Sequence, residues 1–315
     1  MKKWEELYQK MTGFAVTYFL KDLHADREDF YALSDQELRS GEIWYCLSGK
    51  VLNLIMDGEL KKARELIDSI PEDNPPQAVF LKLGLSLVHP EVKLCDFLKI
   101  LDHLTQINVH LYSFTLTAGR PFLLNGFNDF TRLGMLLPSS REIFLSRAKY
   151  IYPENLCPYI YNLCLAEYYY QQNRLTDAQL LASTTIKKFD IEGERRIMFS
   201  ALFLRSKILL AEGKTVKSES FVKEIRSLVK NTGNAEFSYN IEATGVLFAL
   251  YEGKNSRAAE WLKSDAPDEY EDFNMLDLFR YMIKMRCYIL TKKYNSVVAL
   301  AEKLRPLLET GKRFM

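Results

Sequence analysis

Few residues in this chain have the type and spacing that catalysis or metal binding requires. None of the four histidines forms an H-x-x-x-H pair with another, so no two imidazoles share a helix face as a zinc site would need. The five cysteines include no C-x-x-C pair, and their odd number does not indicate a disulfide framework. We therefore expect no metal, no cofactor and reduced, mostly buried thiols.

Motifs for nucleophilic catalysis or nucleotide binding are also missing from the sequence. There is no G-x-S-x-G motif. The only Gly-Lys-Thr begins at Gly213, and Ile208 stands where the first glycine of a G-x-x-x-x-G-K-[ST] loop should be. We expect that the chain is not an enzyme and does not hydrolyse ATP.

The overall charge does not favour nucleic acid as a partner. Lys and Arg number 42 against 41 Asp and Glu, a net charge of +1, so we expect no direct binding of nucleic acid by this chain. No window approaches the ~20 apolar residues of a membrane span, and the N-terminus lacks the features of a secretion signal. The expectation is a cytoplasmic protein that does not contact a membrane.

The charges are nevertheless distributed unevenly near the C-terminus. Residues Arg280 to Arg313 contain nine basic and two acidic residues, a balance of +7, whereas Glu260 to Asp277 contain seven acidic residues and one lysine, a balance of −6. A solvated outer helix face explains both segments. The alternative is that they dock onto a partner or another domain.

The elements that would position a binding site are indicated by a repeat. In four stretches an apolar, helix-like run ends in a turn and a second run begins at once. The turn residues recur every 40 positions, a small or short residue follows five positions later in each stretch, and Gly58 with Ala63 forms a fifth copy. The turns are Asn173, Gly213, Gly253 and Lys293, and the residues five positions later are Ala178, Ser218, Ala258 and Val298.

This period predicts an all-α fold made of tandem αα-hairpins that stack into a right-handed, tetratricopeptide-like superhelix. The period also lies near the lower end of HEAT and armadillo units, but the small residue after each turn favours the tetratricopeptide type. We expect one helical-repeat domain over residues 1–315. It comprises N-terminal repeats in 1–108, an irregular motif segment in 109–134 and regular 40-residue repeats in 135–315.

The segment from Ser113 to Gly134 resembles one in the helical-repeat region of LuxR-family, MalT-like transcriptional regulators. There a Thr-x-Gly-Arg-Pro stretch leads into Leu-Asn-Gly and an aromatic-rich Asp-Phe, whereas Phe122-Leu123 departs from the smaller pair of the family. A weaker similarity in repeat layout runs from about Trp44 to the C-terminus. The matching residues are Thr117, Gly119, Arg120, Pro121, Leu124, Asn125, Gly126, Asp129 and Phe130.

The resemblance implies a ligand- or partner-binding sensor region of such a regulator. Members of that family also carry an ATPase module and a DNA-binding helix-turn-helix, and neither is visible in this sequence. The alternative is a free-standing tetratricopeptide adaptor that binds a peptide or helix of another protein. In either case the partner, a small-molecule inducer or a protein, would occupy the concave groove of the superhelix.

Candidate binding residues are polar groups on the runs that precede the turns, because the first helix of each hairpin lines the concave face. Asn125, Asp129 and Arg132 share one face of a predicted helix; they could contact the inducer or form a local network with Arg120. Tyrosines at 159, 161 and 168–170 could also line the groove, although repeat packing needs aromatic residues there too. The candidates are Arg120, Asn125, Asp129, Arg132, Asn162, Glu167, Arg205, Asn240, Glu242 and Arg280.

Overall fold

The computed structural model describes the chain in segments, and most of the described residues, 80%, are helical while none lies in a strand. The expectation of a helical protein is confirmed at that level. The motif segment 109–134, and with it Arg120, Asn125, Asp129 and Arg132, lies outside the described residues. The described residues are 24–34, 44–69, 139, 141–149, 154–192, 195–214, 220, 223–227, 235–271 and 277–310.

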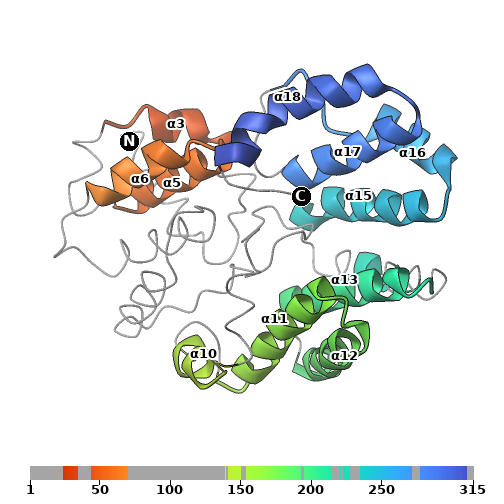
Figure 1. Ribbon diagram of the computed structural model, residues 1–315. Coiled ribbons are helices and arrows are strands. Elements are labelled where there is room, and N and C mark those ends of the chain that lie inside the picture. The colour runs from red at the N-terminus through yellow and green to blue at the C-terminus, as the bar shows by residue number, and fades with distance from the viewer. Residues whose placement is uncertain are drawn as a thin grey trace. The chain divides into compact units, whose positions relative to one another are not determined.

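The chain divides into two compact units. The first contains residues 1–107 and 272–276. Its described helices are α3 (Arg27–Tyr31), α5 (Trp44–Met56) and α6 (Leu60–Asp68), which pack on one another in chain order (Figure 1). The ring of Phe30 in α3 is fully buried and lies directly over Gly49 of α5, where a Cβ atom would clash with it. This glycine lets the two helices approach closely.

The second unit contains residues 108–271 and 277–315. Within it, α11 packs on α12, α12 on α13, α15 on both α16 and α17, and α17 on α18 (Figure 1). Its described helices are α10 (Arg141–Ala148), α11 (Cys157–Gln171), α12 (Leu175–Glu192), α13 (Arg195–Ala211), α15 (Ala235–Tyr251), α16 (Asn255–Ser264), α17 (Leu278–Leu290) and α18 (Tyr294–Thr310).

Five turns in the described segments share one geometry. A residue with positive φ donates its N–H to the carbonyl three positions earlier at 3.0–3.1 Å, and the next residue donates to the carbonyl five positions before itself at 2.8–2.9 Å. These two bonds define a Schellman motif, which satisfies carbonyls at the end of the preceding helix. The positive-φ residues are Gly58, Asn173, Gly213, Gly253 and Lys292.

The predicted turn positions are therefore confirmed, with a correction of one residue in the last repeat. Lys293 lies in the turn, but the left-handed residue is Lys292. The position five residues later is consequently Val297. The choice of Val298 was wrong, because its side chain is 56% exposed, whereas Ala63, Ala178 and Ala258 are completely buried. Ser218 lies outside the described residues.

One apolar core joins α11, α13, α15, α16 and α17 of the second unit. The rings of Phe203 in α13 and Phe279 in α17 meet edge to face, with centroids 6.4 Å apart.

The four described cysteines are buried and free, as the sequence predicts, and burial raises the pKa of the Cys157 and Cys287 thiols to about 11. Among the helices that the structure describes, none combines the length and apolar character needed to cross a bilayer.

A polar cluster ties α3 to the turn between α5 and α6 in the first unit. The Asp57 carboxylate accepts a hydrogen bond from His24 Nε2 at 2.6 Å and from the Tyr31 hydroxyl at 2.5 Å. Burial of Asp57 disfavours its ionised form, but the hydrogen bonds from His24 and Tyr31 outweigh it and lower the pKa of this carboxyl. The cluster therefore stabilises the unit most when Asp57 is ionised.

Substitutions at the left-handed residues should change stability in opposite directions. Gly253→Ala should lower the free energy of unfolding by about 1–2 kcal/mol, because an L-residue resists this conformation; no atom lies within 4 Å of the added Cβ to cause a clash. Lys292→Gly should raise it by up to ~1 kcal/mol, since relief of this strain exceeds the entropic cost of glycine. Urea denaturation of the full chain measures both, and a stabilising Gly253→Ala would contradict the assignment of the turn.

Asp57→Asn should destabilise the chain in a pH-dependent way. A carboxyl whose folded-state pKa lies below its unfolded value of ~4 stabilises the fold above that value, and this contribution is lost as the pH falls through the folded-state pKa. We expect a loss of about 1–3 kcal/mol at pH 7, which becomes smaller as the pH falls below ~4. Asp68→Asn is the control because Asp68 is exposed and pairs with Arg64 of its own helix; equal effects of both substitutions at pH 7 would contradict the prediction.

Candidate functional site

The C-terminal ends of four helices in the second unit carry tyrosines and cations at related positions. The helices that end in a turn, α11, α13, α15 and α17, are called the first helices here. Tyr170 lies three residues before the left-handed residue that follows α11, and Tyr251 lies two residues before the one that follows α15. Lys207 and Arg286 each lie six residues before the left-handed residue that follows α13 and α17.

These four side chains form two tyrosine–cation contacts, one with the ring and one with the hydroxyl. The Lys207 Nζ lies over the ring of Tyr170, 4.8 Å from its centroid, and Arg286 Nη1 donates to the Tyr251 hydroxyl at 3.1 Å. In both, a cation of one first helix meets a tyrosine of another. Burial raises the pKa of Tyr170, and Tyr251 and then Glu167 raise it further, so the two tyrosines are electrostatic neighbours. Together, Tyr170, Lys207, Tyr251 and Arg286 are called the tyrosine–cation row.

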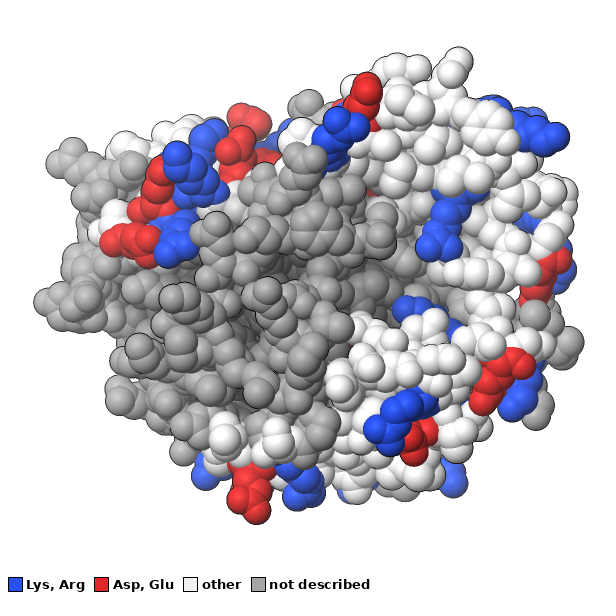
Figure 2. Space-filling model, in the orientation of Figure 1, with Lys and Arg blue, Asp and Glu red and all other residues white. Residues whose placement is uncertain are grey.

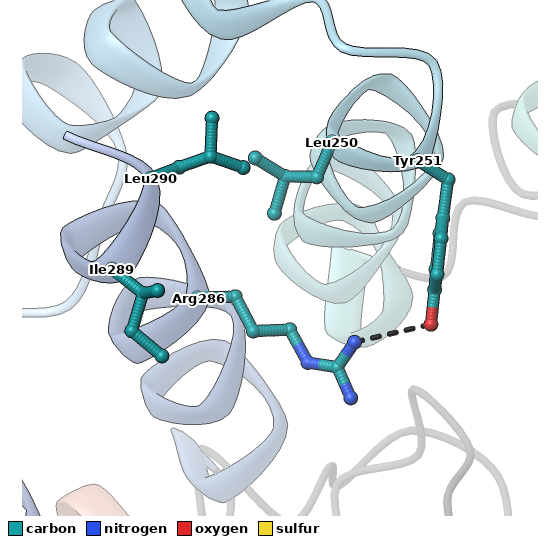
Figure 3. A pocket seen from close by; sticks show the side chains of 5 residues that line it. All are labelled: Leu250, Tyr251, Arg286, Ile289 and Leu290. Carbon is teal, nitrogen blue, oxygen red and sulfur yellow. Dashed lines mark hydrogen bonds between the residues drawn. The ribbon is translucent and has the colours of Figure 1, made fainter.

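An open pocket of about 230 Å³ lies at one end of this row. In Figure 3 the Leu250 and Leu290 side chains approach each other, while Arg286 reaches towards the Tyr251 hydroxyl. Tyr251 and Ile289 are 58% and 53% exposed, so both are accessible to a ligand. The lining residues are Leu250, Tyr251, Arg286, Ile289 and Leu290.

The pocket is smaller than the 300–1,000 Å³ common for drug-sized ligands. It therefore suits one apolar group of side-chain size, with an anionic or hydrogen-bond-accepting group next to Arg286. Of these lining side chains, tyrosine and arginine are types that often dominate binding energy at interfaces.

One residue proposed from the sequence lies near the row. Glu167 is three residues before Tyr170 in α11, about 60° from it around the helix axis, whereas Asn162 is eight residues before it, about 12 Å away along the axis. Glu167 is 4% exposed and acts on Tyr170 electrostatically. Glu167 therefore lies close to Tyr170 of the row, but it is buried below the protein surface.

Three other proposed residues are turned away from the row. Arg205 Nη1 donates to the Gln179 carbonyl of α12 at 3.1 Å, on the face of α13 opposite Lys207. Glu242 pairs with Arg226 and Arg257, and its nine-residue separation from Tyr251 places the two on opposite faces of α15. Arg280 binds Asp277 and the Asp265 carbonyl. Asn240 is in α15, but its side chain lies outside the described residues.

The reason for this difference is the helical period. The sequence pattern predicts which residues belong to the first helices, whereas the face on which a residue lies depends on its distance from the turn. The pattern therefore does not predict Lys207, Tyr251, Arg286 and Ile289. The signal that identifies the two cations is their shared position six residues before the turn, and it emerges only when the last turn is centred on Lys292.

The tyrosines named from the sequence have different roles. Tyr161 is buried in the core, and Tyr159 packs against that core from a partly buried position. Tyr169 holds the Arg174 guanidinium over its ring at 4.1 Å. Tyr170 lies under Lys207 of another first helix. The tyrosines of α11 therefore serve core packing and also provide a contact between first helices.

The acidic and basic segments near the C-terminus bind each other within the chain. Lys284 donates to the Pro267 carbonyl at 2.6 Å and forms an ion pair with Glu269. Tyr288 also donates to the Glu269 carboxylate, at 2.7 Å, and Lys303 of α18 donates to carbonyls of the same segment. Side chains of α17 and α18 thus anchor the connection 265–271, and much of the uneven charge is used inside the protein.

The remaining surface charge is mixed in sign. On the face drawn in Figure 2, basic and acidic side chains of the described residues alternate and form no extended patch of one sign. Within the described ranges, no group of three His, Cys, Asp or Glu side chains could hold a metal ion.

No protein-family model matches the chain, and comparison with curated proteins finds no match. The candidate site therefore depends on the geometry of the described residues, and the tyrosine–cation row with its pocket is the surface best suited to recognition.

Lys284→Met should destabilise the second unit. The lysine side chain is only 7% exposed, and its removal leaves the Pro267 carbonyl and Glu269 without their cation, which should cost about 1–3 kcal/mol. Lys293→Met is the matched control, because this exposed lysine lies over the same Tyr288 ring at 5.7 Å and should change stability by less than ~0.5 kcal/mol. Urea unfolding of the full chain measures both, and a larger effect at Lys293 would contradict the anchoring role of Lys284.

Proposed function

We propose that this chain is a helical-repeat binding module whose second unit recognises its ligand through the tyrosine–cation row. The observation that carries this proposal is a pair of contacts in which a cation of one first helix meets a tyrosine of another, through the ring of Tyr170 and through the hydroxyl of Tyr251. In the proposed architecture, the helix pairs stack as tetratricopeptide-like αα-hairpins in a right-handed superhelix. The row then lies on the concave side, which the first helices line.

The chemistry of the row defines the class of ligand. Arg286 uses one N–H for the Tyr251 hydroxyl, and a guanidinium has further donors for a carboxylate or another acceptor. The exposed Tyr251 ring and Ile289 offer apolar contact beside it. A ligand that combines an anionic group with an aliphatic or aromatic group matches both features.

The particular role that we propose is the sensor region of a LuxR-family, MalT-like transcriptional regulator. The resemblance of residues 113–134 supports this role, and the row would receive the inducer. This chain would contribute binding, while separate modules of the regulator would hydrolyse ATP and bind DNA.

The second candidate is a tetratricopeptide adaptor, and the shape of the site favours it in one respect. The row involves four helices, whereas the pocket accommodates one group of side-chain size. An extended peptide could place one apolar side chain in the pocket and a carboxylate near each cation. A single small inducer would use only part of the row.

Two measurements distinguish the candidates. A thermal-shift screen of the full chain against small metabolites, sugars and acidic-apolar peptides reports any ligand that binds the native state, because binding raises the melting temperature. A shift with a metabolite favours the sensor, and a shift with peptides favours the adaptor. An ATPase module or a helix-turn-helix encoded beside this region in the native gene would also favour the regulator.

The row itself is tested by substitution. Tyr251→Ala and Arg286→Ala should each weaken binding of the ligand found in the screen by tenfold or more, about 1.4 kcal/mol. Tyr294→Ala is the matched control, because Tyr294 of α18 is 59% exposed against 58% for Tyr251. Lys187→Ala and Lys223→Ala test the residues outside the first helices. Equal losses in the controls, or full binding by both row variants, would overturn the proposal.

A further inference from the structure

Two arginines converge on the face of α15 that points away from the tyrosine–cation row. Arg226 comes from the helical residues 223–227, and Arg257 comes from α16. The Glu242 Oε2 atom lies 3.0 Å from Arg226 Nη2 and 4.0 Å from Arg257 Nη2. Three separate parts of the chain therefore bring two guanidinium groups to one carboxylate.

Gly245 shows how close the two guanidiniums are. A Cβ atom on this residue would lie 2.6 Å from Arg226 Nη2 and 2.6 Å from Arg257 Nη2, so the two nitrogens lie within twice that distance of each other. Glycine inside a helix costs about 1 kcal/mol relative to alanine. The chain has this costly residue at the one place where both guanidiniums rest on the α15 backbone.

The charges at this cluster do not cancel. Among the described residues, Glu242 is the one carboxylate within ion-pair distance of Arg226 or Arg257, so the group keeps a net charge of +1. Arg226 also has an Nε atom that is buried without a hydrogen-bond partner in this part of the chain. The Arg226 and Arg257 side chains are 35% and 40% exposed, so a solute can reach them.

We propose that Arg226 and Arg257 form a binding site for a phosphate group, over Gly245 and beside Glu242. A phosphate monoester carries a charge near −2 at neutral pH and three acceptor oxygens. Arginine recognises such groups through paired N–H donors. Two guanidiniums within a few ångströms of each other, with only one acid between them, have the charge and donors that this ligand needs. The group could belong to free phosphate or to a small phosphate monoester.

The proposal predicts that neutralising Glu242 increases the affinity for phosphate. Its carboxylate competes with phosphate for the same donors and repels it, so Glu242→Gln raises the charge of the cluster from +1 to +2. Phosphate should then bind at least tenfold more tightly. Arg226→Gln and Arg257→Gln should each weaken binding at least tenfold, and Gly245→Ala should weaken it by displacing both guanidiniums.

The experiment titrates the full chain with inorganic phosphate and, separately, with phenyl phosphate at low ionic strength, and follows binding by calorimetry and phosphorus NMR. Arg174→Gln is the control, because it removes the same charge from an exposed arginine that pairs with Asp177 and lies over the Tyr169 ring. Tighter binding of phenyl phosphate identifies a monoester site, and equal or tighter binding of inorganic phosphate identifies a site for the free ion.

The proposal fails if neither probe binds saturably to the native chain or to the Glu242→Gln variant. It also fails if Arg174→Gln weakens binding as much as Arg257→Gln, because the effect would then be general electrostatic attraction. The Glu242→Gln variant tests for an increase in phosphate affinity, so it still tests the proposal if an arginine variant does not fold. Tyr251→Ala should bind phosphate normally, which separates this site from the tyrosine–cation row.

Discussion

The left-handed turn after each first helix is the constraint on which the rest of the second unit depends. It ends the helix at a fixed residue through two backbone hydrogen bonds and sets where the next helix begins. Residues that lie the same number of positions before the left-handed residue therefore occupy equivalent places in different repeats. Lys207 and Arg286 are 79 residues apart in the sequence, yet both lie six positions before their turn and both contact a tyrosine of another first helix.

Close approach of the helices is the second consequence of that turn. Ala178 and Ala258 follow their left-handed residues by five positions and are fully buried, because a larger side chain there would separate the paired helices. The core that results joins five helices, and ends of these helices carry the row.

The helical elements and their turns could be predicted from the sequence because glycine and asparagine at 40-residue spacing report the left-handed conformation directly. The last turn shows the limit of that signal. Lysine rarely adopts positive φ, so Lys292 does not stand out, and the neighbouring Lys293 keeps the 40-residue spacing whereas Lys292 follows Gly253 by 39 residues. The error of one residue moved Val298 into the small position and hid the shared position of Lys207 and Arg286.

The candidate site was less predictable, because a side chain's residue type does not show what it faces. Arg205 and Lys207 are both basic and two positions apart on α13, but the first donates to α12 and the second reaches Tyr170. The same ambiguity affects charge. The −6 and +7 segments suggested a solvated face or an external partner, and tertiary contacts instead place Lys284 and Lys303 against the acidic connection.

These contacts also distinguish structural cations from cations available for recognition. Lys284 is buried, and its donors are directed at Pro267 and Glu269, so it holds the chain together and has little capacity for a ligand. Arg286, two residues later, is exposed, and its one hydrogen bond within the described segments goes to the Tyr251 hydroxyl. A guanidinium in that state keeps most of its charge and donors for a ligand. A basic residue of this fold that has acceptors of the chain around it thus has a structural role. A basic residue with few such acceptors keeps donors and charge with which to bind an anion.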